Sequence, residues 1–227
     1  MTRLGILTGV RAEARVLRVL SGTAPLTACS GADADRAHRL AAEMGARGAT
    51  ALVSFGLAGG LTPGLKAGTL LLASGVVLPD GSERPVSPAW RAAVLARAQA
   101  AGLSLSGGRI AGVRRMAATP ADKRALAERS GSAAVDMESA AVALAAREAG
   151  LPFLVLRAVA DPPDAGVPPW ALAGVGDDGR LRPFRIAAGL LRDPRSLPAA
   201  LRLARDGQAG LSALRGALAR LGSLDPP

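Results

Sequence analysis

The sequence predicts an α/β protein, a three-layer sandwich in which helices flank a mostly parallel central sheet. Apolar segments of strand length alternate with segments of helical periodicity along most of the chain, which is typical of parallel strands joined by crossover helices. Hydrophobic residues make up 49% of the 227 residues, enough to bury a substantial core. Neither an internal repeat nor a low-complexity linker interrupts the pattern, so residues 1–227 are predicted to form a single domain.

The predicted elements follow from apolar periodicity and from turn residues at their ends. The predicted strands span 3–9, 25–31, 49–61, 68–78, 133–135 and 151–161, with a further short segment at 106–112. The predicted helices span 12–20, 33–45, 87–102, 138–150 and a stretch that begins at 119. The helix at 87–102 has a Ser-Pro start and a Gly stop. Together these elements form a core over about 3–161, followed by a Gly/Pro/Asp-rich loop at 161–180 and C-terminal helices over about 183–222.

Several classes of protein are excluded by simple features of the chain. No run reaches the roughly 18 to 20 consecutive apolar residues of a transmembrane helix, and the N-terminus lacks the pattern of a signal peptide. A single cysteine, Cys29, excludes an internal disulfide framework and agrees with a reducing compartment. We interpret Cys29 as a small buried residue at a strand end rather than as a nucleophile. A cytoplasmic protein is therefore expected.

The net charge of +10 comes almost entirely from arginine, and residues 180–220 hold nine Arg against Asp193 and Asp206. Nucleic-acid binding usually adds aromatic platforms, but the chain has no Tyr, three Phe and two Trp, so we expect no nucleic-acid partner. Clustered Arg beside apolar helix faces fits peripheral contact with an anionic membrane, here the inner membrane. On the last helix one predicted face carries Leu197, Leu201, Ala204, Leu211 and Leu218, with Arg202 and Arg220 opposite. A terminal helix packed on the sheet is the favoured interpretation of that face.

Chemistry-bearing residues cluster where the predicted strands stop, which is where such sheets bind ligands. The residues at these ends are Gly9, Arg11 and Glu13, then 56–60, then Asp136, Met137 and Glu138, and finally Asp161. Each has a simpler explanation: Glu13 as an acid in the first turn of a helix, Asp136 as an N-cap, and Asp161 as a turn residue before two prolines. Their coincidence at one edge of the sheet nevertheless predicts a binding site.

Four segments in order resemble the nucleoside phosphorylase and nucleosidase superfamily, which includes purine nucleoside phosphorylase and methylthioadenosine/S-adenosylhomocysteine nucleosidase. The strongest is "VDMESAAVA" (135–143), which looks like the signature of that superfamily. "LGILTGVRAEARVL" (4–17) is similar to its first strand and acidic loop, "SFGLAGGL" (54–61) to its glycine-rich segment, and "LVLRAVAD" (154–161) to the strand that ends in its catalytic Asp. The resemblance implies a nucleoside phosphorylase-like fold over residues 4–161.

The resemblance also implies a role for each matching residue. Asp161 would protonate the departing purine, and Glu13 would activate an attacking water. Glu138 would accept the ribose hydroxyls while Met137 packs against the sugar. The remaining candidates are Gly56, Ala58 and Gly59, which would let backbone amides approach the base or nucleophile, and Arg115 and Met116, which together with Arg114 would line the base. No metal and no cofactor are expected, apart from phosphate as a co-substrate.

Two departures from the superfamily pattern leave the nucleophile open. Ala160 stands where relatives commonly have Ser, and "VSF" (53–55) fills the stretch where phosphorylases often carry a phosphate-binding Arg. Arg11 is the candidate to replace that Arg; otherwise water is the nucleophile. Hydrolysis and phosphorolysis therefore remain equally open on the sequence.

The Arg-rich tail at 179–207 and the Gly/Ala-rich composition look most like the hopanoid-associated branch of the superfamily. That branch is linked to the release of adenine from adenosylhopane, a lipid-linked nucleoside. The alternatives are a soluble nucleosidase of the methylthioadenosine/S-adenosylhomocysteine type, a general purine nucleoside phosphorylase, and a non-enzymatic basic module. His38, the only histidine, is interpreted as an ordinary surface residue. Relatives assemble from two to six subunits, so a homo-oligomer is expected.

Overall fold

The computed structural model describes residues 2–20, 24–168 and 170–227. Its strands are β1 (Leu4–Thr8), β2 (Leu26–Cys29), β3 (Ala51–Gly60), β4 (Leu70–Leu72), β5 (Gly75–Val77), β6 (Glu83–Pro85), β7 (Arg109–Gly112), β8 (Ala134–Asp136) and β9 (Phe153–Asp161). Its α-helices are α1 (Arg11–Val16), α2 (Ala34–Ala46), α3 (Pro88–Ala100), α4 (Pro120–Ser130), α5 (Ser139–Glu148), α6 (Trp170–Ala173), α7 (Pro183–Arg192) and α8 (Leu197–Leu221). Two short 3₁₀ turns, η1 (Leu17–Val19) and η2 (Pro194–Ser196), follow α1 and α7.

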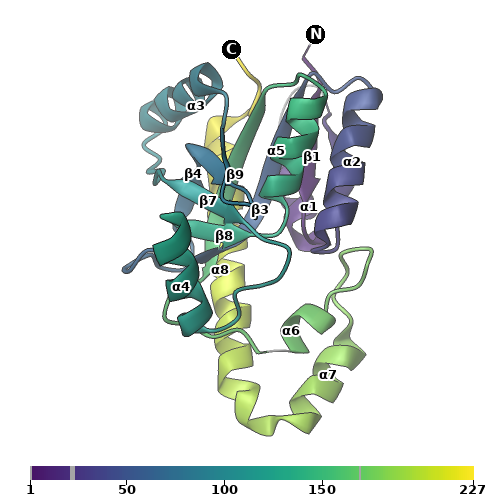
Figure 1. Ribbon diagram of the computed structural model, residues 1–227, viewed down its shortest axis with the longest axis vertical. Coiled ribbons are helices and arrows are strands. Elements are labelled where there is room, and N and C mark those ends of the chain that lie inside the picture. Colours follow the sequence, from purple (N-terminus) through teal and green to yellow (C-terminus); the bar gives the residue numbers. More distant parts are fainter. Residues whose placement is uncertain (1, 21–23, 169) are drawn as a thin grey trace.

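The central sheet is built around β3, which pairs in parallel with β1 on one side and with β9 on the other. The main path of the sheet runs β2-β1-β3-β8-β7-β5-β6, and β9 joins it through β3. The pairings β1/β2, β5/β7 and β7/β8 are also parallel, whereas β3/β8, β4/β9 and β5/β6 are antiparallel. Helices lie on both faces: α2 and α5 pack together on one, and α8 runs along β9 on the other (Figure 1). This confirms the predicted three-layer α/β fold.

One predicted strand is wrong in its continuity. The apolar run 68–78 forms two strands, β4 and β5, which pair with different partners, β9 and β7. The change of partner occurs at Ala73 and Ser74, whose N–H groups donate to the carbonyls of Val155 and Gly108. Both strands are fully buried, and the polar, exposed Ser74 is the single short interruption between them, so the apolar pattern gives only a weak mark of the break. The edge strand β6, with its Pro85, was not predicted either.

The C-terminal helix α8 has two halves with different environments. In the second half, Leu214, Leu218 and Leu221 are buried, as expected for a terminal helix packed on the sheet. Gly210 brings the helix close to the sheet, since a Cβ there would lie 2.6 Å from Leu57 Cδ2. In the first half, however, Leu201 is 64% exposed. The single apolar face predicted from Leu197 to Leu218 is therefore packed only at its C-terminal end.

The first half of α8 extends beyond the sheet and joins α6 and α7 in a lobe at the narrow end of the molecule (Figure 1). Trp170 of α6 ties the lobe together, because its Nε1–H donates to Ser196 Oγ at 3.0 Å and its ring packs against Gly189 of α7. The segment predicted as a long irregular loop thus contains one helical turn, α6, and a bridge between Val175 and Leu181.

Candidate active site

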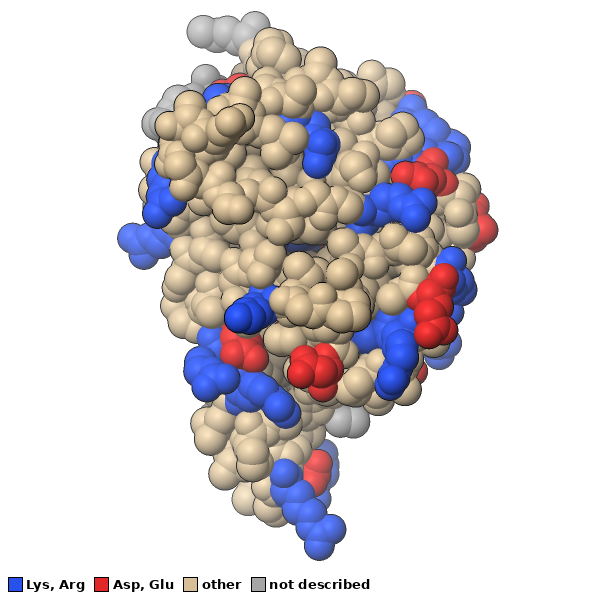
Figure 2. All heavy atoms as spheres, turned by 90° about the vertical axis from the view of Figure 1, so that its left-hand side faces the viewer, with Lys and Arg blue, Asp and Glu red and all other residues tan. Residues whose placement is uncertain are grey.

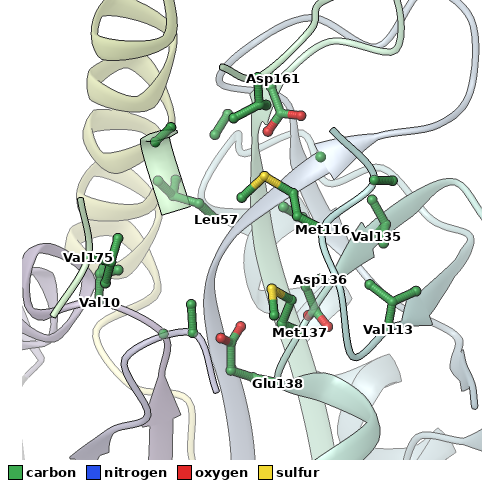
Figure 3. A pocket seen from close by; sticks show the side chains of 18 of the residues that line it. Val10, Leu57, Val113, Met116, Val135, Asp136, Met137, Glu138, Asp161 and Val175 are labelled. Atoms are coloured by element: carbon green, nitrogen blue, oxygen red, sulfur yellow. The ribbon is translucent and has the colours of Figure 1, made fainter. Parts of the chain in front are cut away.

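A pocket of about 260 Å³ lies beside the carboxyl ends of β1, β3, β8 and β9. Four of the predicted carboxylates line it: Glu13 from α1, Asp136 from the end of β8, Glu138 from the turn before α5 and Asp161 from the end of β9. Asp161 and Glu138 lie at opposite ends of the pocket, with the side chains of Met116 and Met137 between them (Figure 3). The remaining wall is mostly apolar and includes Val10, Leu57, Ala58, Val113, Val135, Ala160, Val167, Ala171, Val175 and Leu203.

Three glycines leave the space that these carboxylates occupy. A Cβ at Gly9 would lie 2.7 Å from Glu138 Oε1, one at Gly56 would lie 2.5 Å from Glu13 Oε1, and one at Gly59 would lie 2.9 Å from Asp161 Oδ2. These distances are too short for a real Cβ, so each glycine permits one acidic side chain to pack against the backbone. The glycine-rich strand end therefore shapes the site by accommodating carboxyl groups. This is a different reason from the predicted approach of backbone amides to a ligand.

Glu13 is buried and held by backbone N–H groups. Its Oε2 accepts hydrogen bonds from Gly9 and Val10 at 2.8 and 2.9 Å, and its Oε1 accepts one from Leu57 at 2.7 Å. Burial raises the pKa of Glu13, while Arg157 and these N–H donors act in the opposite direction. A fixed carboxylate with a raised pKa suits a general base, because its proton affinity is then closer to neutral pH.

Arg157 is the cation at the centre of the acidic group. It is fully buried in β9, and its Nε lies 2.7 Å from Asp136 Oδ2 while its Nη2 lies 3.3 Å from Glu138 Oε2. Its Nη2 also donates to Ser54 Oγ at 2.6 Å, and its Nη1 to the carbonyl of Leu57 at 3.3 Å. Burial alone would lower the pKa of Arg157, but the neighbouring carboxylates outweigh it and raise that pKa. The guanidinium therefore stays charged and compensates the buried acids.

Asp136 carries out the structural role that the sequence left open. Its Oδ1 accepts a hydrogen bond from Ser139 N at 2.9 Å, and its Oδ2 accepts one from Ser139 Oγ, so it holds the first residue of α5 although the N-cap position is Glu138. The same carboxylate forms the close ion pair with Arg157. Asp136 therefore anchors both the start of α5 and the buried arginine.

Glu138 is the acid with the most perturbed surroundings. It is buried, Ser30 Oγ donates to its Oε1 at 3.4 Å, and Asp136 and Glu13 are nearby. Burial raises the pKa of Glu138 to about 7; Arg157 lowers it, and the two neighbouring acids raise it further. One cation among three acids leaves an excess of negative charge, so Glu138 exchanges its proton near neutral pH.

Asp161 is paired with a buried lysine from α4. Lys123 Nζ lies 2.5 Å from Asp161 Oδ2, and the Lys123 side chain is 1% exposed. The same ammonium donates to the carbonyls of Pro162 and Ala165 at 2.8 and 3.0 Å, and to that of Asp161 itself at 3.3 Å. Burial raises the pKa of Asp161, and Lys123 partly offsets that effect.

Not every predicted residue reaches the pocket. Arg11 is turned away from it: its Nε donates to the carbonyl of Asp178 at 2.9 Å, and its side chain is half exposed. Arg115 is exposed on the loop after β7, and Arg114 forms a surface ion pair with Asp35 at 2.7 Å. Gly56 lies beneath Glu13 and not in the wall. Ala58, Gly59, Met116, Met137, Glu138, Glu13 and Asp161 do line the pocket.

Two smaller interpretations concern Cys29 and His38. The Cys29 thiol is half-buried at the end of β2 and donates to the carbonyl of Gly9 at 3.2 Å. Burial raises its pKa, which is the opposite of what an activated thiol needs. His38 lies on the surface of α2, with its Nε2 3.0 Å from Glu148 Oε2.

Sequence reasoning missed two charged residues of the site, Arg157 and Lys123. Arg157 had a signal, since it is the one charge inside the apolar run of β9 and such a charge is buried only when it is paired. The signal for Lys123 was weaker: it is a cation near the start of a helix, where acidic residues are favoured. For neither residue does the sequence identify the carboxylate with which it pairs.

Within residues 2–20, 24–168 and 170–227, no cluster of three or more His, Cys, Asp or Glu side chains is arranged to hold a metal ion. No helix in the same ranges is both long and apolar enough to cross a membrane.

The fold is similar to that of several solved structures. Methylthioadenosine/S-adenosylhomocysteine nucleosidase from Neisseria meningitidis, in complex with methylthio-immucillin-A, is 17% identical, with 97% of this chain and 98% of that chain covered and a TM-score of 0.74. The corresponding nucleosidase from Helicobacter pylori is 20% identical, with 96% and 97% covered and a TM-score of 0.68. Futalosine hydrolase from the same organism is also 20% identical, with 96% and 97% covered and a TM-score of 0.67. At these identities the likeness concerns the fold.

A search of curated proteins found no match to the chain. A family model described as "Phosphorylase superfamily" matches residues 6–192, which include every pocket-lining residue named above except Leu203. The match spans most of the chain and confirms the superfamily that the four motifs predicted. This protein therefore belongs to the Phosphorylase superfamily.

Proposed function

We propose that the protein cleaves the N-glycosidic bond of a purine nucleoside and releases adenine. The observation that carries the proposal is one pocket with Asp161 at one end and the two buried acids Glu13 and Glu138 at the other. Cleavage of a glycosidic bond builds positive charge on the sugar and negative charge on the departing base. A pocket with a proton donor at the base end and carboxylates at the sugar end is complementary to that charge separation.

Each acid has a distinct task in this mechanism. Asp161 donates a proton to a ring nitrogen of the base as the bond to the sugar breaks. Glu138 accepts hydrogen bonds from the ribose hydroxyls, while Met137 packs against the sugar. Glu13, held in place by three N–H donors, accepts a proton from the attacking water. The structural relatives described above, nucleosidases and a hydrolase, agree with this chemistry.

Water is the nucleophile favoured by the charges around the pocket. Among the described residues that line it there is no Arg or Lys. Arg157 is enclosed by Asp136 and Glu138, and Lys123 is paired with Asp161. A phosphate dianion in this pocket would meet carboxylates without a free cation, which is unfavourable at low dielectric. Adenine release should therefore be independent of added inorganic phosphate; a rate that requires phosphate would replace hydrolysis by phosphorolysis.

The finer proposal is that the nucleoside is lipid-linked, as in adenosylhopane. Support comes from the lobe of α6, α7 and α8, which supplies Ala171, Val175 and Leu203 to the pocket wall. The same segment carries exposed apolar side chains, which we call the 181–201 patch: Leu181, Phe184, Leu191, Leu197 and Leu201. Phe184 is 89% exposed and Leu191 is 82% exposed, whereas such side chains are normally covered. An apolar substituent on the ribose could thus extend from the pocket towards an apolar surface.

The charge around the 181–201 patch favours an anionic membrane as its partner. Arg185, Arg192 and Arg202 lie on the same two helices, α7 and α8, and are exposed, and none of them forms an ion pair with a described residue. Basic side chains are visible on the narrow lower end of the molecule in Figure 2. A symmetric contact between two copies would bring this basic surface against itself, which like-charge repulsion disfavours.

Liposome binding tests this surface. The protein should sediment with vesicles that contain phosphatidylglycerol at low salt and be released as ionic strength rises, since each Arg near an anionic surface contributes about 1 kcal/mol. Phe184→Ser and Arg202→Gln should each weaken sedimentation without changing the hydrolysis of a soluble nucleoside. Arg220→Gln is the matched control. The sequence placed both arginines opposite the apolar face, but Arg220 lies about 27 Å further along α8, within the half that packs on the sheet.

Substrate choice separates the lipid-linked proposal from its alternative, a soluble nucleosidase of the methylthioadenosine/S-adenosylhomocysteine type. Adenosylhopane in anionic vesicles should release adenine faster than free methylthioadenosine does. Efficient cleavage of methylthioadenosine, with no vesicle binding and no activity on the lipid, would support the alternative and leave the glycosidase mechanism intact.

Glu138→Gln is expected to impair catalysis far more than folding, because the amide keeps the size of the side chain but binds the ribose hydroxyls less well. The wild type should discriminate against a nucleoside that lacks the 2′-hydroxyl, and the variant should discriminate less. Steady-state kinetics on the matched pair of nucleosides measures both effects. Unchanged discrimination would remove Glu138 from sugar binding.

The same variant has a pH signature in stability. Burial raises the pKa of Glu138 from 4.5 to about 7, so the native state favours the protonated form. The stability that this group contributes is present below its unfolded pKa and is lost as pH rises through about 7. As pH rises from 4.5 to about 7, the unfolding free energy of the wild type should therefore fall relative to that of Glu138→Gln. Urea denaturation at several pH values measures this difference.

A further inference from the structure

The Lys123–Asp161 pair has features that a purely structural lysine would not need. Lys123 is fully buried, and leaving an ammonium group out of water is costly unless it is closely paired. Three backbone carbonyls at the end of β9 and in the segment after it accept its hydrogen bonds and would satisfy an ammonium group by themselves. In addition, its Nζ lies 2.5 Å from the one carboxylate at the base end of the pocket.

We propose that Lys123 is a positioning residue for Asp161: it fixes the carboxyl group at the edge of the pocket and stabilises the carboxylate that remains after Asp161 has given its proton to the departing base. This rests on the proposed function and names a part of the machinery that the three acids alone do not include.

The proton balance is simple. As the bond between the ribose carbon and the base nitrogen breaks, its electron pair stays with the base and the Asp161 proton moves to a ring nitrogen of that base. Water forms the new bond to the sugar carbon and gives its proton to Glu13. Asp161 is left negatively charged beside the Lys123 ammonium group, and solvent exchange restores the two protonation states after the products leave. Because charge appears on Asp161 only during proton transfer, the fixed cation stabilises the transition state more than the ground state.

The surroundings of Asp161 make this effect local. The described charged groups that face it are Lys123 from α4 and, at longer range, Asp206 from α8, which opposes the effect of Lys123. Asp206 is itself paired with the exposed Arg205 at 3.3 Å. Lys123 is therefore the cation that controls the Asp161 carboxyl. Removing it should raise the pKa of Asp161 beyond the rise that burial already causes.

Kinetics of Lys123→Met test the proposal. Methionine keeps the length of the side chain and removes its charge. We expect kcat for adenine release to fall roughly 10- to 10²-fold with KM changed by less than about twofold. The alkaline limb of the kcat profile should also move to higher pH, since the acid form of Asp161 would persist longer. A lysine with only a structural role would lower the melting temperature without moving that limb.

Lys66→Met is the matched control, because Lys66 is the other lysine of the chain and is exposed. It should leave kcat, KM and the pH profile unchanged. Wild-type kinetics in Lys123→Met, or an alkaline limb that stays in place, would overturn the proposal.

A second measurement needs neither substrate nor a folded Lys123→Met protein. With ¹⁵N-labelled lysine the protein has two ammonium signals, and the one from Lys123 should follow the titration of Asp161 in the wild type and lose that response in Asp161→Asn. No response in the wild type would contradict the pairing. If the response is present but no nucleoside is cleaved, the proposed function fails and the Lys123–Asp161 coupling stands.

Discussion

Asp161→Asn is expected to lower kcat for adenine release by about 10²-fold or more, because asparagine has the shape of the carboxyl group but cannot protonate the leaving base. The effect should be confined to catalysis. Lys123 loses its charged partner, yet the carbonyls of residues 161, 162 and 165 remain to accept its hydrogen bonds. Circular dichroism and the melting temperature would report whether the fold is retained, and steady-state kinetics would report the loss.

Asp164→Asn gives the appropriate comparison. Asp164 is an exposed carboxylate in the same segment, three residues further along and outside the pocket wall. It should retain wild-type kcat. A folded Asp161→Asn protein with near wild-type turnover would remove Asp161 from the mechanism and, with it, the proposed task of Lys123.

Arg157→Met should have the largest effect on stability, a loss of about 3–5 kcal/mol in unfolding free energy, because it leaves buried acids without their cation. Asp136 would lose an ion pair of 2.7 Å and Glu138 one of 3.3 Å. The loss should also depend on pH. Without Arg157 the native pKa of Glu138 rises further, so the deficit is smallest in acid, where the carboxyl group is neutral, and grows as pH rises.

Urea denaturation at several pH values measures this dependence. Arg147→Met is the control, since Arg147 is an exposed arginine near the end of α5 and should cost at most about 0.5 kcal/mol. A loss below about 1 kcal/mol in Arg157→Met, or one that is the same at all pH values, would mean that the buried acids are compensated in another way.

The sequence alone was enough for the fold class and for the position of the acids. Strands such as 3–9 and 151–161 can be predicted because each apolar run ends sharply at a glycine or a charged residue, and this signal depends only on neighbouring residues. Parallel strands bring their carboxyl ends to one edge, so Glu13 and Asp161, which follow or end the parallel strands β1 and β9, could be expected together. Glu138 follows β8, which pairs antiparallel with β3, so its place in the same pocket depends on the tertiary structure. All three line the same pocket. The alternation of segments likewise predicts helices on both faces of the sheet.

Tertiary structure decided which partner each charge has. Lys123 meets Asp161 across 38 positions of the chain, and Arg157 meets Ser54 across 103. It also turned Arg11 towards Asp178, left Arg115 in solvent and divided the run 68–78 between two neighbours. Hydrophobic periodicity indicates only whether a residue is buried, and the apolar pattern of a buried strand is the same whichever strand it pairs with. The partner of a buried charge depends on distances between side chains that only the packed chain defines, and those distances separate a structural acid such as Asp136 from a proposed catalytic one such as Asp161.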